Sequence, residues 1–422
     1  MTTEKLYWRD AYREEFEAER CTLSSLGDRP TVVCDATVFY PEAGGQLGDR
    51  GVLLAGGDAS LGLEVVDTQI DEVGTIHHVL AAMPSDEARA ALARGVRGRV
   101  DGARRVTQRA QHTAQHMLSC ALLTEASAAT ASARLGTNAS TIDVERDTID
   151  DAALARAEDL VNAVIRDNLT VSAFFPDAAR LASLPLRRPP KVSENVCIVA
   201  VGDYAAYYDV TPCGGTHVSR TGEIGAVRVA SVERYKGMTR VTFIAAAEAI
   251  NDARAKHAAL VALGRELSCG PLDVPSALLK LRADLKTERD AATKLRGELA
   301  DAIATNLLAS AAASPSPERA FVPIVHVHDG ADVSFLRSLA GRLTERADVV
   351  AAIAASGPNG ASIVVQRGAA ARFDCGAFWK GVIAPLGGRG GGSSARAEGR
   401  APGPMTREFL ETQLRVAEAE RA

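Results

Sequence analysis

Two short histidine-containing segments, about a hundred residues apart, constrain the fold of this 422-residue chain more than any other feature. The first, QHTAQHMLSC, starts at Gln111, and the second is PCGGTH, residues 212–217. His112 and His116 lie one helical turn apart among good helix formers, so a helix would present both imidazoles on one face. Cys213 and His217 have the same spacing. Because zinc prefers thiolate and neutral imidazole ligands, the two segments predict one tetrahedral site that brings distant parts of the chain together.

Each half-site alone has an ordinary structural explanation. Two histidines at helical spacing are more often a solvent-facing or hydrogen-bonded pair than metal ligands, and a single cysteine is usually a small buried hydrophobe. The chain has only eight histidines, however, and three of them fall in these two segments. The combination therefore favours a metal site over two unrelated structural features.

Composition indicates a globular protein without a membrane segment. Hydrophobic residues make up 46% of the chain and charged residues 24%, and a chain of this length is expected to form two to four domains. No apolar run is long enough to span a bilayer, and the start of the sequence lacks the pattern of a signal peptide, so we expect a cytoplasmic location. The seven scattered cysteines do not form a disulfide framework.

Basic runs flank both half-sites although the net charge is −5. The net charge argues against a protein that coats nucleic acid indiscriminately, but it allows local positive surfaces. Such runs are usually solvated faces. Their position beside the expected metal ligands instead favours a polyanionic substrate. The runs contain Arg94, Arg97, Arg99, Arg104, Arg105 and Arg109, then Arg187, Arg188 and Lys191, then Arg228, Arg234, Lys236 and Arg240.

The pattern of strands and helices predicts an α+β protein in four parts. Residues 1–95 contain short strands separated by turns, which is typical of a small β-barrel, and include a Gly-rich loop. Residues 96–245 mix helix and strand and contain the zinc ligands. Residues 246–315 are rich in helix formers and predict a helical hairpin followed by a linker at Ser314–Pro317. Residues 316–422 predict a C-terminal α/β domain.

The helical and C-terminal parts carry weaker signals. Pro271 and Pro275 divide the helical part, and a leucine stripe from Leu278 to Leu299 predicts an antiparallel hairpin. Dimerisation of the chain, through this hairpin or through the C-terminal domain, is the second interpretation. The Gly-rich run from Gly387 to Ser394 lacks the lysine spacing of a phosphate loop and is a weak nucleotide signal.

Three motifs, in this order, resemble those of alanyl-tRNA editing proteins, the free-standing AlaX relatives of the editing domain of alanyl-tRNA synthetase. They are FYPEAGGQLGDRG at residues 39–51, HTAQH at 112–116 and CGGTH at 213–217. The resemblance covers residues 1 to about 245. The tail resembles the C-terminal domain of the long form of AlaX more loosely, because Ser393, Ser394 and Arg396 depart from the usual pattern. No class II aminoacylation domain precedes Tyr7, so the resemblance implies editing without charging.

The resemblance implies zinc held by His112, His116, Cys213 and His217. It also implies hydrolysis of the ester that joins a wrong amino acid, chiefly serine and also glycine, to the tRNA for alanine. Four protein ligands would close the coordination shell. Either one ligand, such as His217, yields to water, or the zinc organises the substrate amine; both alternatives stay open.

Further site residues are expected from the same motifs. Gln46 could orient water or the tRNA end, while Gly44, Gly45 and Thr216 would bind substrate. Thr37 matches the threonine of the family motif and is the expected reader of the serine hydroxyl, because a hydrogen-bonding site rejects an analogue that lacks the group. An ordinary β-branched strand residue is the structural alternative for Thr37.

Two other classes of function compete with editing. A zinc peptidase would carry a glutamate after the first histidine of a His-Glu-x-x-His motif, but Thr113 follows His112. A non-catalytic tRNA-binding protein with a structural zinc has the same ligands. Deacylation of mischarged tRNA separates these alternatives.

Overall fold

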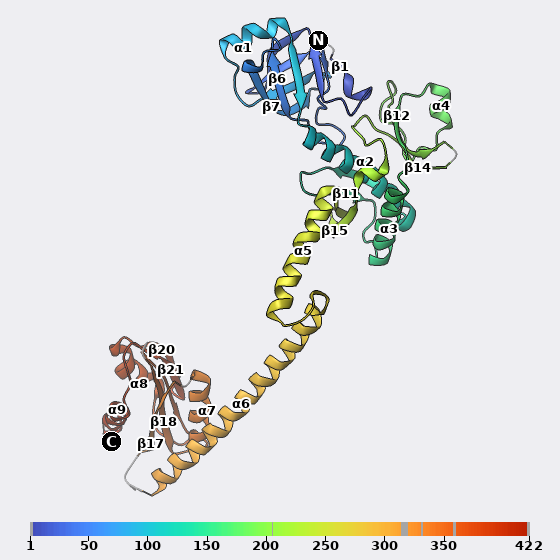
Figure 1. Cartoon of the computed structure of the whole chain (residues 1–422). Helices are drawn as coiled ribbons and strands as arrows, with labels where there is room; N and C mark the ends of the chain where they lie inside the picture. The colour runs from blue at the N-terminus through green and yellow to red at the C-terminus, as the bar shows by residue number, and fades with distance from the viewer. Residues whose placement is uncertain (1–2, 205, 314–319, 331, 358–359, 420–422) are drawn as a thin grey trace. The chain divides into compact units, whose positions relative to one another are not determined.

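A computed structural model describes residues 3–204, 206–313, 320–330, 332–357 and 360–419. The chain divides into two compact units, Met1–Ala262 and Leu263–Ala422 (Figure 1). The whole is a mixture of helices and several sheets, so the predicted α+β class is confirmed. The finer division into four parts stays a prediction. None of the helices in the described ranges is long and apolar enough to cross a membrane.

The N-terminal part of the first unit is a seven-stranded antiparallel sheet. Strand β2 alternates exposed and buried residues, and its buried Phe16 and Ala18 face a core shared with Leu53. The pairing order runs from β2 to β3, and closure into a barrel stays a prediction. The order is β2 Glu15–Ala18, β9 Val96–Val100, β6 Gly51–Ala55, β7 Gly62–Ile70, β8 Ile76–Leu80, β4 Arg29–Cys34 and β3 Cys21–Leu26.

Shorter elements complete this part. Strands β1 and β5 pair with each other in parallel. Strand β9 pairs with β6 and lies beyond residue 95, where the sequence predicted the end of this domain. The elements are β1 Glu4–Lys5, η1 Leu6–Trp8, β5 Ala36–Thr37, η2 Ala59–Leu61, α1 Asp86–Ala91 and η3 Leu92–Arg94.

Helix α2, Gly102–Ala126, is the buried centre of the first unit. The Asp101 side chain caps its first turn by accepting from the Arg104 N–H, and Ser127 ends it in the left-handed conformation. Arg105, with no exposed surface, forms an ion pair with Asp49. Its guanidinium also donates to the Val38 carbonyl at 2.6 Å. This pair fastens the helix to the loop that precedes β6, and its burial makes loss of either partner costly, about 3–5 kcal/mol.

Two antiparallel sheets and α3 pack around α2. The sequence predicted a mixture of helix and strand here, but pairing partners depend on long-range contacts that a sequence pattern does not specify. The four-stranded sheet is β10 Thr130–Arg134, β11 Ser140–Val144, β16 Met238–Ala245 and β15 Val227–Tyr235; the three-stranded sheet is β12 Val171–Phe174, β13 Ile198–Asp203 and β14 Ala206–Pro212. The helices are α3 Asp151–Asp167, α4 Ala178–Ser183 and η4 Thr221–Ile224.

The expected break at the two prolines is present. Helix α5, Ala247–Glu266, is followed by η5, Pro271–Asp273, and by α6, Val274–Ala312, with Pro275 in its first turn. The antiparallel hairpin stays a prediction because these helices fall in different units. The predicted linker at Ser314–Pro317 lies outside the described residues.

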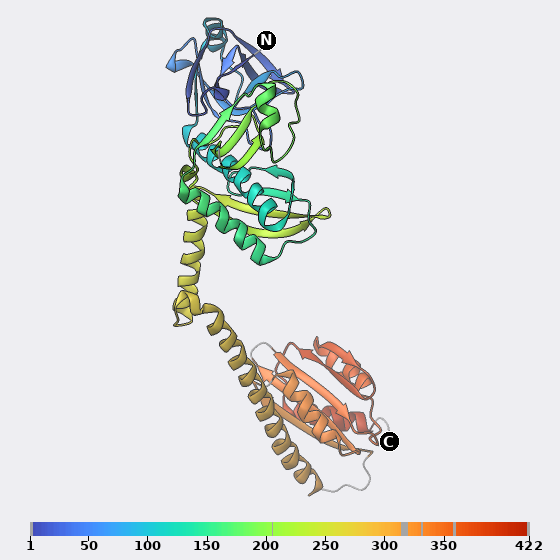
Figure 2. The same cartoon turned by 90° about the vertical axis from the view of Figure 1, so that its right-hand side faces the viewer.

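The second unit contains a three-layer α/β arrangement, to which α6 contributes from outside the predicted range 316–422; the bounds of that domain stay a prediction. Odd-numbered residues of the central strand β18 pack beneath α6 and α7, and even-numbered ones beneath α8 and α9. Figure 2 shows the sheet of this unit with its helices. The sequence did not predict strand β18, because its Ala-rich run lacks the alternation of apolar and polar residues that is typical of a strand. The sheet order is β17 Val322–Asp329, β18 Val349–Gly357, β19 Gly360–Arg367, β21 Arg396–Ala401 and β20 Arg389–Gly392; the helices are α7 Val333–Thr344, α8 Cys375–Phe378, η6 Trp379–Ile383, η7 Ala384–Leu386 and α9 Arg407–Ala419.

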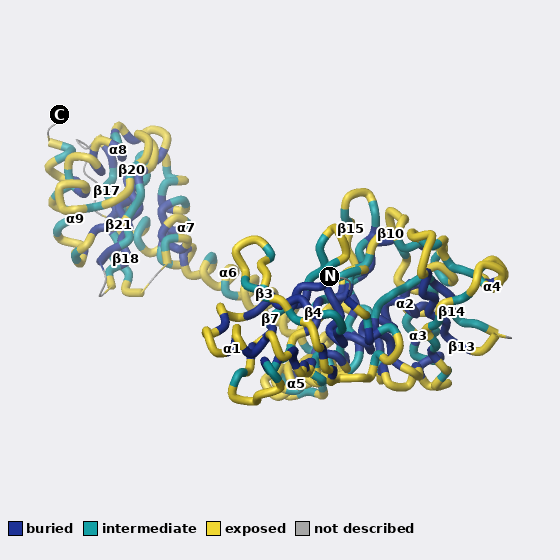
Figure 3. Tube along the Cα trace, turned by 90° about the horizontal axis from the view of Figure 1, so that it is seen from above, coloured by how far each residue is buried: buried dark blue, intermediate teal, exposed yellow. Residues whose placement is uncertain are grey.

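The Gly-rich run forms a hairpin, β20 and β21, and not a phosphate loop. A Cβ at Gly390 or Gly399 would lie within 3 Å of the buried Trp379 ring, so glycine allows the hairpin to pack on that ring. Figure 3 shows buried positions gathered in the interior strands of each unit.

His78, one of the two histidines on β8, provides a test of the fold of the N-terminal sheet. His78 is fully buried, with Nδ1 2.8 Å from the Val32 carbonyl and Nε2 2.8 Å from the Thr37 hydroxyl. Burial lowers the pKa of His78 from 6.5 to about 4. Between pH 6.5 and 4, His78 is protonated in the unfolded chain but stays neutral in the folded chain. The free energy of unfolding therefore falls by roughly 3 kcal/mol as the pH drops from 6.5 toward 4.

We expect His78→Gln to remove this pH-dependent term. Urea unfolding would be followed by Trp8 fluorescence in a Trp379→Phe background, since these are the two tryptophans of the chain. The stability difference between parent and variant should shrink from pH 7 to pH 4. Parallel pH profiles for the two proteins would contradict the assigned environment.

Candidate metal centre

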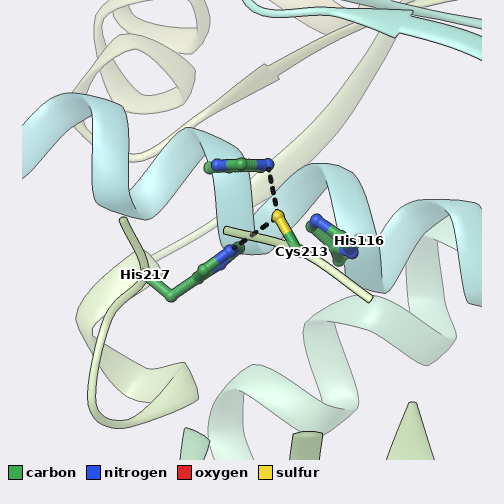
Figure 4. Close-up of side chains that lie close together, drawn as sticks. His116, Cys213 and His217 are labelled. Carbon is green, nitrogen blue, oxygen red and sulfur yellow. Dashed lines mark hydrogen bonds between the residues drawn. The ribbon is translucent and has the colours of Figure 1, made fainter. Parts of the chain in front are cut away.

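The four predicted ligands come together in one cluster. His112 and His116 project from α2, and Cys213 and His217 come from the segment after β14 (Figure 4). One ligand atom of each residue lies within 4.8 Å of those of the other three. The Cys213 Sγ is 3.5 Å from the Nε2 of His112 and 3.4 Å from the Nε2 of His217. The donor set and its spacing therefore match a tetrahedral metal site.

Hydrogen bonds fix two of the imidazoles with Nε2 facing the sulfur. The Nδ1 of His112 lies 2.8 Å from the Oε1 of Gln46, which can only accept, so Nδ1 carries the proton. The Nδ1 of His217 lies 3.1 Å from the hydroxyl of Thr113. That hydroxyl also donates to one backbone carbonyl and accepts from one backbone N–H. Outer partners of this kind orient metal-binding histidines and fix the tautomer.

His116 has unmet hydrogen-bonding capacity. Both of its ring nitrogens are buried without a hydrogen-bond partner. Its Nδ1 is 4.0 Å from a carboxylate oxygen of Asp209, which itself pairs with Arg187 at 2.7 Å. Leaving a buried polar atom unpaired is costly, and a metal ion held by one of these nitrogens would remove the cost at that atom. The residues present thus fit a metal ion.

Burial keeps the three imidazoles neutral, as metal binding requires, but it also keeps the Cys213 thiol protonated. It lowers the pKa of His112 to about 3, with a smaller effect from Arg188, and lowers those of His116 and His217 well below 6.5. The imidazoles are therefore neutral. Burial raises the pKa of Cys213 to about 11, so metal binding would have to displace the thiol proton.

A pocket of about 500 Å³ opens onto the cluster. His112, His116 and Cys213 line one side of it, and the β10 residues Thr130 and Ser132 line another. Carboxylates are missing from the lining, whereas four cations contribute to it. An anionic ligand would therefore be favoured over a cationic one. The cations are Lys5, Arg187, Arg188 and Lys191.

Gln46 and Thr216 are buried supports, with no exposed surface and no part in the pocket lining. The Gln46 Nε2 donates to the Thr216 hydroxyl at 2.8 Å, and its Oε1 accepts from the Thr216 N–H at 3.0 Å as well as from His112. The expectation that Gln46 orients water is thus replaced by a positioning role. Its polar atoms are already engaged by protein groups.

The two glycines of the predicted loop have different roles. Gly44 lines the pocket, in agreement with an approach to substrate. Gly45 does not; a Cβ there would lie 2.4 Å from the Ala133 carbonyl, and its φ is +88°. Glycine at residue 45 allows the loop to pack against β10, which brings that strand to the pocket.

The structure separates Thr37 from the pocket. Its hydroxyl is fully buried between His78 and the Phe39 N–H, at 2.8 and 3.0 Å, and it does not contribute to the lining. Thr130 has the opposite surroundings, because it lines the pocket and its buried hydroxyl lacks a hydrogen-bond partner. Sequence reasoning missed Thr130; only its place on the first strand after the histidine helix could have signalled it.

We expect His116→Ala to bind zinc at well below one ion per chain, because three donors remain and the orphaned ring is gone. His257→Ala, an exposed histidine on α5, is the matched control and should bind as the parent does. Elemental analysis after dialysis gives the zinc content, and circular dichroism checks the fold. Full zinc occupancy in the His116 variant would remove this residue from the ligand set.

Comparison with known families agrees with this site. Residues 196–242, which include Cys213 and His217, match the family model described as the threonyl and alanyl tRNA synthetase second additional domain. The chain is 36% identical over 313 residues to an alanine–tRNA ligase of Halorubrum lacusprofundi, covering 72% of this chain and 32% of the ligase. It is 33% identical to the ligase of Halobacterium salinarum, covering 86% and 38%.

An editing protein and one solved structure are also similar. Alanyl-tRNA editing protein AlaX-L of Pyrococcus horikoshii is 33% identical over 254 residues, which cover 59% of each chain. The C-Ala domain structure from Aquifex aeolicus alanyl-tRNA synthetase matches 23% of this chain and 92% of its own, at 22% identity and a TM-score of 0.22, too weak a likeness to assign a function. The chain thus spans about a third of the ligases and about three fifths of the editing protein.

The sequence matches name the same kinds of protein as the resemblance in the motifs, and the family-model match includes two of the four cluster residues, Cys213 and His217. The chain is thus related to the alanyl-tRNA editing protein AlaX-L and to one region of alanine–tRNA ligases, and it resembles an AlaX-like alanyl-tRNA editing protein.

Proposed function

We propose that the chain is a zinc-dependent hydrolase that removes a wrong amino acid, chiefly serine and also glycine, from tRNA(Ala). The observation that carries the proposal is the four-residue cluster opening onto a pocket lined by cations and free of carboxylates. The relationship to a protein named an alanyl-tRNA editing protein supports the choice of substrate. A zinc ion held by the cluster would supply Lewis-acid chemistry.

The chain's own residues supply positioning. Gln46 and Thr113 hold two imidazoles in the ligating tautomer, and Asp209 faces the third. The surrounding cations would hold a polyanion near the cluster. Because an aminoacyl ester is already activated, orientation beside the site accounts for much of the required rate.

The direct test is hydrolysis of Ser-tRNA(Ala), with Ala-tRNA(Ala) as the control substrate. We expect the zinc-loaded chain to release serine and to spare alanine. Gly-tRNA(Ala) in the same assay tests the second substrate. Tight tRNA binding without release of any amino acid would instead support the alternative function, a non-catalytic tRNA-binding protein with a structural zinc.

Selectivity for serine requires a partner for its hydroxyl, and we assign that role to Thr130. The Thr130 side chain lines the pocket and its buried hydroxyl has no hydrogen-bond partner, so a rotation about χ1 would let it bind the serine hydroxyl, whereas alanine would leave it unpaired. Thr37, the residue expected from the motif, already has two protein partners.

We expect Thr130→Val to slow Ser-tRNA(Ala) hydrolysis by roughly ten-fold, equivalent to one or two kcal/mol, and to narrow the preference over alanine. Thr37→Val is the matched variant with the same chemical change. Single-turnover rates on both substrates distinguish the two residues. A loss of discrimination in Thr37→Val but not in Thr130→Val would return the role to Thr37.

A further inference from the structure

Two of the seven cysteines, Cys21 and Cys34, lie opposite each other on β3 and β4 of the N-terminal sheet. Their sulfur atoms are 3.2 Å apart, and both thiols are free. They pack with the core of that sheet, whereas Cys213 packs against the core around α2. The fold thus holds two thiols in contact that neither the metal site nor the proposed hydrolysis uses.

The hydrogen-bonding register at this pair suits a disulfide. The Asp35 N–H donates to the Arg20 carbonyl at 3.0 Å, so residues 20 and 35 form a hydrogen-bonded pair. Cys21 and Cys34, one step further along, therefore form a non-hydrogen-bonded pair. Such pairs have Cα atoms about 4.5 Å apart, within the range of about 4.4–6.8 Å that a disulfide spans. The two cysteines can therefore be cross-linked without a change of register.

The two thiols differ in their access to solvent. Cys21 is partly exposed, whereas Cys34 has no exposed surface. The neighbouring Cys21 thiol, together with burial, raises the pKa of Cys34 well above its ordinary value. Because the thiolate is the nucleophile in thiol–disulfide exchange, Cys34 is a poor first nucleophile. An oxidant in solution would therefore react with Cys21 first.

We propose that Cys21 and Cys34 form a redox modification site, which a low-molecular-weight disulfide oxidises reversibly to a disulfide across β3 and β4. The Cys21 thiolate attacks one sulfur of the oxidant and displaces a thiolate, which takes up the proton that Cys21 lost. The Cys34 sulfur then attacks the Cys21 sulfur and displaces the second thiol, which carries away the Cys34 proton. Two electrons pass to the oxidant, which leaves as two thiols. The contact between the two sulfurs favours this second, intramolecular step.

The cross-link would fasten a part of the sheet on which the start of the chain rests. The Cys34 carbonyl accepts from the Thr3 hydroxyl at 2.7 Å, and the Asp35 carbonyl accepts from the Glu4 N–H at 2.7 Å. Strand β1 is therefore attached next to the cross-link, and it also carries Lys5, which lines the metal pocket. Oxidation would stabilise both β3, at the end of the pairing order, and the attachment of β1.

The test uses the zinc-loaded full chain in a buffer with an excess of reduced over oxidised glutathione, which suppresses mixed disulfides. After alkylation of free thiols, cleavage before Asp28 and Asp35 leaves the two cysteines in different peptides. We expect mass spectrometry to find these two peptides joined by a disulfide in most chains, with the zinc content unchanged. A dithiol reductant should restore both thiols.

The order of the two steps is tested with Cys34→Ala. In oxidised glutathione alone, this variant should keep glutathione bound at Cys21, because the second thiol that would displace it is missing. Cys269→Ser, which removes a partly exposed thiol in the segment after α5, is the matched control. It should form the link between Cys21 and Cys34 as the parent does.

Urea unfolding measures the effect on the fold. We expect the oxidised parent to unfold at a higher urea concentration than the reduced parent, because the cross-link restricts the unfolded chain. Cys34→Ala in the same excess-thiol buffers should show no such rise. An equal or lower midpoint for the oxidised parent would mean that the sheet must distort to accept the bond, which contradicts the register argument.

Three other results would overturn the inference. They are free thiols at both positions of the parent, a lasting glutathione adduct at its Cys21, and loss of zinc with a disulfide at Cys213. The outcome does not depend on hydrolysis of any tRNA ester.

Discussion

The hydrogen bonds of Gln46 are the interactions on which the rest of the site depends. A single buried carboxamide accepts from His112 and from the Thr216 N–H and donates to the Thr216 hydroxyl. It therefore joins the Gly-rich loop, α2 and the Cys-Gly-Gly-Thr-His segment, which are far apart in the sequence. The ligating nitrogen of His112 is directed toward Cys213 only while this arrangement holds. The buried Arg105–Asp49 pair fastens the same loop region to α2 from the other side.

Burial of the cluster links folding, protonation and metal binding. The imidazoles are neutral because a charged form would be desolvated, and the Cys213 thiol keeps its proton for the same reason. A divalent ion reverses the second effect by stabilising the thiolate, so its binding releases a proton and weakens as pH falls. His116, with both nitrogens unpaired in the buried site, gains most from an ion. The donor groups of the site are thus placed to bind a metal ion, and without an ion the unpaired nitrogens of His116 lower the stability of the fold.

The sequence predicted what local spacing encodes and missed what long-range contacts decide. His112, His116, Cys213 and His217 were identified because their spacing and chemistry suffice. The role of Gln46 could not be read, since its partners lie 66 and 170 residues away. The sequence also could not distinguish Thr37 from Thr130 as the partner of the serine hydroxyl, because both are strand threonines. Only the tertiary structure shows that Thr37 has hydrogen-bond partners, whereas Thr130 lines the pocket and its hydroxyl has none.

The central claim is that two distant segments make one metal site with three nitrogens and one sulfur. X-ray absorption at the zinc edge of the loaded full chain tests it most directly. The account predicts one sulfur at about 2.3 Å and nitrogen neighbours at about 2.0–2.1 Å, with the sulfur scattering lost in Cys213→Ser. A shell of oxygen and nitrogen alone in the parent protein, or a sulfur signal that survives Cys213→Ser, would contradict it.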